Sequence, residues 1–158
     1  CSMATLTVTL KEELELNGKD RGSELTLSVG SVTQAYHRIV TCPANNDTTI
    51  ATFQTAVHTA DNAIDLEDAK YIRVTNLDTS NEVVLSLQIS NSENGTADGS
   101  ASILLAAGRS YIMGIPHEGI ACDDDSAAII TDTALHDLES LVVDPKANSV
   151  SVEVFIAS

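Results

Sequence analysis

The feature that most constrains the fold is a strict alternation of aliphatic and polar side chains. In TLTVTL, residues 5–10, threonine alternates with leucine and valine, and the alternation returns in SVSVEVFIA, residues 149–157. Successive side chains of a β-strand point to opposite faces, so this period gives each strand one aliphatic and one polar face. The pattern therefore predicts half-buried strands. With aromatic residues at 3% and no Trp, the core must be built from aliphatic side chains.

Turn signals divide the alternating stretches. NGKDRG at residues 17–22 follows the first strand, and a second strand at residues 24–29 is predicted to complete a hairpin with it. NLDTSN at residues 76–81 is predicted to be the turn of a second hairpin within residues 71–89. Further strands are expected at residues 32–42, at 48–53, as a pair within 102–115, and near the end of the chain from 149 to 157.

The second predicted hairpin has a clear inner and outer face. The side chains expected to face the core are Ile72, Val74, Val83, Leu85, Leu87 and Ile89. The side chains expected on the outer face are Tyr71, Arg73, Val84 and Gln88. Because Tyr71 and Val84 are large and apolar, we predict that they contact another subunit instead of water.

One stretch has a helical spacing. Leucines recur at 135, 138 and 141, and Asp132 or Thr133 is suited to cap a helix. This spacing predicts a short helix over residues 134–140, with a strand as the alternative, favoured for Ile129 and Ile130.

About eight to ten short strands with little helix predict an all-β fold. We expect an antiparallel β-sandwich, jelly-roll-like, with at most one or two short helices. Residues 4–158 are expected to form this single domain. Residues 1–3 are expected to be a cloning remnant followed by the start methionine.

The charge balance argues against two classes of partner. The chain has 8 Lys and Arg against 23 Asp and Glu, a net charge of −15. Nucleic-acid binders need a basic surface to displace counterions from phosphates, and an anionic membrane repels an acidic protein. We therefore expect neither nucleic acid nor membrane as a partner.

No arrangement of residues predicts catalysis, and we expect neither an enzyme nor a cofactor. Asp123, Asp124 and Asp125 are weak candidates for a calcium site, since consecutive carboxylates point in different directions and the usual loop pattern is absent. His117, Glu118, Cys122 and Asp123 lie close in sequence, but zinc needs ligands that converge from defined positions. A solvated loop is the favoured interpretation of both groups.

Two other groups are also better explained without a site. Ser110, His136 and Asp137 have the composition of a catalytic triad, but the sequence lacks the strand–turn–helix motif that presents such a serine. Cys42 and Cys122 lie outside any motif, and without a secretory signal they are expected to be reduced, packed thiols.

Four stretches together resemble small virion structural proteins of tailed bacteriophages of the marine and environmental type. They are ATLTVTLKEELELNGKDRGS at 4–23, AKYIRVTNLDTSNEVVLSLQI at 69–89, LLAAGRSYIM at 104–113 and VSVEVFIAS at 150–158. They follow in this order over about half of the chain, and they are structural segments that carry no catalytic residues.

The resemblance implies a non-enzymatic building block of the particle, either a capsid decoration protein or a component of the tail or a fibre. It also implies a homo-oligomer, with a trimer favoured, that contacts other virion proteins. Its location would be the virion, after assembly in the host cytoplasm. The alternative function is a β-sandwich module that binds a host surface or carbohydrate, with calcium held by Asp123, Asp124 and Asp125.

Overall fold

The computed structural model describes residues 3–54, 63–65, 69–90, 99–114, 121–122 and 136–158. Within these ranges the chain forms strands and no helix, so the all-β prediction is confirmed. The strands are β1 Ala4–Glu12, β2 Glu15–Leu16, β3 Lys19–Asp20, β4 Ser23–Val32, β5 Ala35–Cys42, β6 Thr48–Gln54, β7 Ala63–Asp65, β8 Tyr71–Asn76, β9 Val83–Ser90, β10 Gly99–Leu105, β11 Ser110–Met113, β12 Ala121–Cys122, β13 His136–Asp144 and β14 Val150–Ala157.

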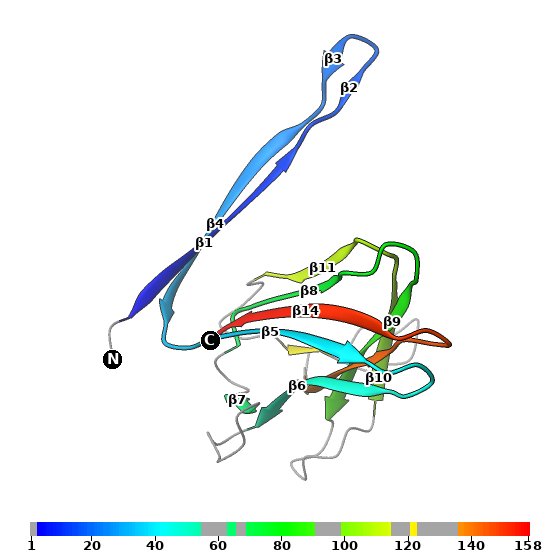
Figure 1. Cartoon of the computed structure of the whole chain (residues 1–158). Coiled ribbons are helices and arrows are strands. Elements are labelled where there is room, and N and C mark those ends of the chain that lie inside the picture. The colour runs from blue at the N-terminus through cyan, green and yellow to red at the C-terminus, as the bar shows by residue number, and fades with distance from the viewer. Residues whose placement is uncertain (1–2, 55–62, 66–68, 91–98, 115–120, 123–135) are drawn as a thin grey trace.

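Two sheets face each other as a β-sandwich (Figure 1). The first sheet has the order β11-β8-β14-β5, and all its neighbours are antiparallel. The second has the order β10-β9-β13-β6-β7, with β12 paired to β13 and with β7 parallel to β6. Successive strands often lie in opposite sheets, an order compatible with the expected jelly roll. The β-sandwich is confirmed, while the finer jelly-roll assignment stays a prediction.

The core between the sheets is aliphatic, as the composition predicts. Its fully buried side chains include Ile72, Val74, Leu85, Val152 and Val154. Every side chain that was expected to face the core from residues 72–89 is buried, and the inward set of the last strand is buried too, at Val150, Val152, Val154 and Ile156. The two-residue period therefore predicts correctly which face of each strand is covered.

The predicted hairpin at residues 71–89 is wrong in its pairing. β8 pairs with β14 and β11 in one sheet, whereas β9 pairs with β10 and β13 in the other. Residues 77–82 thus carry the chain from one sheet across to the other. Alternation specifies the face that a strand buries, but it does not specify the strand's neighbour, so the faces were predictable and the pairing was not.

The helix predicted over residues 134–140 is also wrong where the structure describes it, because His136–Asp144 is the strand β13. Leu138 and Leu141 are both buried although three positions separate them. The register of β13 against β9 shifts between Leu138 and Ser140. A β-bulge adds a residue to one strand and changes the facing of those that follow. The bulge therefore produces the three-residue spacing that resembles a helix.

The N-terminal hairpin is confirmed, and it extends from the sandwich as an arm made of β1, β4 and the short strands β2 and β3 (Figure 1). At its tip, Asn17 and Gly18 both have positive φ, at 54° and 71°. Two such residues in succession form the tight turn whose twist suits a hairpin. β1 has nine residues, which at about 3.3 Å per residue makes it roughly 30 Å long.

Candidate interaction surface

The base of the arm packs on the outer face of the first sheet. Val29 and Val32 of β4 form a buried cluster with Tyr71 of β8 and Ala157 of β14. Leu6, Val8, Leu27 and Phe155 pack around this cluster. The contact gives the arm a second apolar core, separate from the core between the sheets.

Hydrogen bonds at the C-terminal end of β14 hold the segment that joins the arm to β5. The amides of Thr33 and Gln34 donate to the carbonyl oxygen of Ser158, at 2.7 and 2.9 Å, and the Ser158 amide donates to the Gln34 carbonyl at 3.0 Å. Nearby, the Lys70 Nζ donates to the carbonyl oxygen of Ser31 at 2.7 Å. These bonds anchor the arm where it leaves the sandwich. The single strand that was expected over residues 32–42 is therefore interrupted: β4 ends at Val32, and β5 begins at Ala35.

One face of the arm is an aliphatic stripe, defined here as Leu6, Val8, Leu10, Leu25, Leu27 and Val29. The register places Leu6 opposite Val29, Val8 opposite Leu27, and Leu10 opposite Leu25. Burial falls along the stripe: Val29 is fully buried, Leu27 is half-buried, and Leu10 and Leu25 are 46% and 63% exposed. The sandwich therefore covers the proximal half of the stripe and leaves the distal half uncovered.

The opposite face of the arm is polar. Thr7 lies opposite Ser28, Thr9 opposite Thr26, and Lys11 opposite Glu24. All of these residues are exposed. The arm is thus an amphipathic two-stranded ribbon whose polar face suits water and whose distal apolar face does not.

Beyond the base of the arm, the outer face of the first sheet carries a charged group. The Glu153 carboxylate on β14 forms an ion pair with Arg73 on β8 and accepts a hydrogen bond from His37 Nε2 on β5 at 3.3 Å. The hydrogen bond from Arg73 and that from His37 hold the pKa of Glu153 below its usual value. Phe155 meets the rings of His37 and Tyr71 edge to face, each at 6.0 Å between centroids. This row links three strands across the sheet, and its polar groups are already paired.

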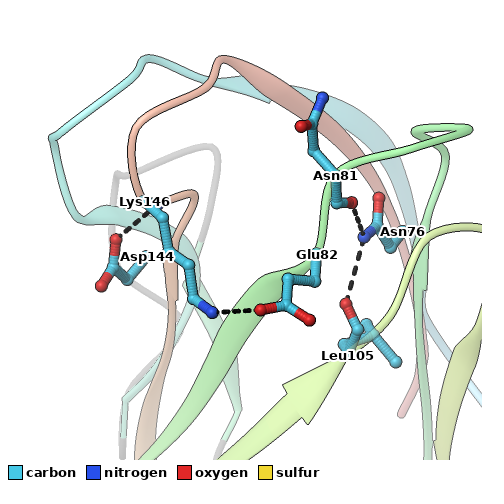
Figure 2. A network of polar contacts seen from close by, with 6 residues as sticks. All are labelled: Asn76, Asn81, Glu82, Leu105, Asp144 and Lys146. Carbon is cyan, nitrogen blue, oxygen red and sulfur yellow. Dashed lines mark hydrogen bonds and ion pairs between the residues drawn. The ribbon is translucent and has the colours of Figure 1, made fainter.

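At the far end of β8 from the arm, a polar network closes the corner between the sheets (Figure 2). The buried Asn76 donates through Nδ2 to the carbonyl oxygens of Asn81, at 2.9 Å, and of Leu105, at 3.1 Å. Its Oδ1 accepts a bond from the amide of Asp78 at 2.9 Å. Since Asn76 belongs to one sheet and Leu105 to the other, this side chain fastens the two sheets together.

The remaining groups at this corner shape the loop at residues 77–82. The Asp78 Oδ1 accepts bonds from the amides of Ser80 and Asn81, at 2.8 and 2.7 Å. These backbone bonds lower the pKa of Asp78. Glu82 forms an ion pair with Lys146 of the neighbouring turn (Figure 2). The network has the features of a structural corner, because its polar groups satisfy one another.

The two residues predicted to contact another subunit lie on outer faces. Tyr71 is only 5% exposed, because the base of the chain's own arm covers it. Val84, on β9, is half-buried. Contact between either residue and another subunit stays a prediction, and Tyr71 has little surface left for it.

The weak metal candidates Asp123, Asp124 and Asp125 lie outside the described residues, as do His117 and Glu118. Among the residues that the structure describes, no group of three or more His, Cys, Asp or Glu is placed to hold a metal ion. Of the expected reduced thiols, Cys42 is free and buried. The same part of the chain contains no helix suited to cross a membrane.

The three residues with the composition of a triad come from different sheets. Ser110 belongs to β11 of the first sheet, and its hydroxyl lies 2.7 Å from the Thr75 hydroxyl. His136 and Asp137 belong to β13 of the second sheet.

The uncovered half of the arm is the feature that sequence reasoning missed. Both strands of the hairpin were predicted, together with their aliphatic faces. The signal that was available is that the aliphatic residues of this hairpin continue from Leu10 to Leu14 and Leu16, into a stretch rich in charge. Core strands between two sheets seldom mix leucine and charge in this way.

Comparisons with known proteins identify one weak structural similarity. No protein-family model and no curated protein matches the chain. Among solved structures, it is similar to a subunit of Bacillus endospore appendages, described as a novel family of disulfide-linked pili, with a TM-score of 0.37 and 13% identity. The match covers 78% of this chain and 84% of the other. At this score the similarity supports no statement about fold or function.

Proposed function

We propose that this protein is a non-enzymatic structural subunit of a bacteriophage particle, and that it acts by assembling with other copies and with other virion proteins. The observation that carries the assembly part is the arm. A two-stranded ribbon alone in water is marginally stable, and it gains stability when its apolar face is covered. The distal half of this arm has an apolar face at Leu10 and Leu25 that the described part of the chain leaves exposed.

The exposed fractions along the arm support an interaction role. Leu14 and Leu16 near the tip are each 54% exposed, in addition to Leu10 and Leu25. Single exposed leucines are ordinary on protein surfaces, but a group on one extended element is typical of an interaction surface. A subunit that works by assembly needs such a surface, whereas an enzyme of this size does not.

The virion part of the proposal rests on the resemblance of the four sequence stretches. One of them, residues 4–23, contains β1 and the tip of the arm, and another, residues 150–158, contains β14, which contacts the base of the arm. The resemblance therefore includes the element that carries the exposed stripe. The capsid, the tail and a fibre are equally suitable places for the subunit.

Mass spectrometry of purified particles tests the virion proposal. Phage would be induced from the host that carries the gene, banded by density, and digested with protease. We expect peptides of this chain at a fixed ratio to the major capsid protein across independent preparations. Absence of these peptides from intact particles, with the protein abundant in the lysate, would refute a virion role.

A further inference from the structure

We propose that the distal half of the aliphatic stripe on the arm packs against the same stripe of another copy of this chain. This inference rests on the proposed assembly function, and it names the surface and the partner. The distal surface consists of Leu10 and Leu25, which are directly opposite each other in the ribbon. The exposed Leu14 and Leu16 lie further towards the tip, beyond the hydrogen-bonded Glu12 and Ser23, which follow on the same face.

The chemistry of the surface selects an apolar partner. Where the same stripe is covered, at its base, it packs with Tyr71, Ala157 and Phe155. A partner for the distal half must likewise be apolar and must fit one face of a two-stranded ribbon. The same face of a second arm meets both requirements, because two sheets packed face to face bury their aliphatic sides about 10 Å apart.

Charge favours a contact between arms over other contacts between copies. Residues 3–32 contain three cationic residues, Lys11, Lys19 and Arg21, against five acidic ones, Glu12, Glu13, Glu15, Asp20 and Glu24. The arm therefore carries −2 of the net charge of −15, and the rest of the chain carries −13. Two sandwiches of that charge repel each other, whereas two arms of mixed charge can approach and pair opposite charges at their rims.

The area of the exposed leucines sets what a contact between copies must bury. Four half-exposed leucines offer a patch of a few hundred Å², whereas a stable interface buries about 800 Å² on each partner. A symmetric contact between two arms must therefore bury the polar rims of both ribbons together with the leucines. The arm also extends away from the sandwich, so two arms can meet before the acidic bodies do (Figure 1).

The test compares two double variants of the full chain by sedimentation velocity over a range of concentrations. Leu10→Thr with Leu25→Thr removes the apolar pair while keeping β-branched residues that suit a strand. Thr9→Ala with Thr26→Ala changes the pair on the polar face of the ribbon and is the matched control. Circular dichroism and the urea midpoint of each variant verify that the sandwich is folded.

We expect the wild type and the control to associate, and the leucine variant to dissociate with a dissociation constant about a hundredfold higher or more. An oligomer that the leucine variant leaves unchanged would overturn the inference and leave the proposed assembly function standing. A wild-type chain that is monomeric at every concentration would also overturn the inference, whereas the virion role would still be decided by the mass spectrometry of purified particles.

Discussion

The substitution Asn76→Ala tests whether the corner network holds the two sheets together. The Asn76 side chain is fully buried, and it makes three hydrogen bonds, to the carbonyls of Asn81 and Leu105 and from the amide of Asp78. Each bond contributes about 1 kcal/mol net, so their loss should lower the free energy of unfolding by about 3 kcal/mol. A domain has a stability of about 5–15 kcal/mol in total, so this is a large loss.

The assay is equilibrium unfolding in urea, with linear extrapolation to water and with all proteins at the same concentration, because association contributes to apparent stability. The matched control is Asn81→Ala. It keeps the backbone carbonyl that Asn76 uses and loses one side-chain contact of 3.2 Å to Asp78. We expect the control to lose less than about 1 kcal/mol. If Asn76→Ala loses no more than the control, the network does not fasten the sheets and the reasoning is refuted.

Two further predictions concern ionisable groups. Arg73 and His37 lower the pKa of Glu153 in the folded chain. The stability that these contacts supply is therefore fully present above the unfolded pKa of about 4.3, and it is lost as the pH falls through the lower pKa of the folded chain. Urea midpoints measured between about pH 5 and pH 3 should therefore fall less steeply for Glu153→Gln than for the wild type; equal slopes would contradict the assignment. Burial raises the pKa of Cys42, and the reactive form of a thiol is the thiolate. A thiol reagent should therefore modify Cys42 about a hundredfold more slowly in the folded chain than in urea, measured in a Cys1→Ser, Cys122→Ser variant. Equal rates would show that this thiol is accessible.

The sequence predicts one aspect of the fold, which is the face that each strand turns to the core. Alternation at a period of two decides which side chains enter the core, and it places Ile72, Val74, Leu85 and Val152 correctly. It does not decide pairing, since a strand with one apolar face fits equally well beside any neighbour in either sheet. The neighbours of β8 and β9 are decided instead by long-range contacts, including the bond from Asn76 to Leu105, which are 29 positions apart.

The candidate surface could be predicted only in part, for a similar reason. The aliphatic face of residues 5–10 and 24–29 was visible in the sequence, and so was the hairpin. Whether such a face is covered depends on where the hairpin lies relative to the rest of the chain. Tyr71 and Leu10 are both large apolar residues on strands, yet the arm covers the first and nothing within the described residues covers the second.

The most direct test of the central claim is the mass of the full chain in solution. Light scattering coupled to gel filtration would be measured over about a hundredfold range of concentration, at moderate salt to limit repulsion between the acidic bodies. We expect a defined multiple of 16.6 kDa that dissociates on dilution, with slower amide exchange in residues 5–10 and 24–29 of the oligomer. A constant mass of one chain, with fast exchange in the distal arm throughout, would contradict it.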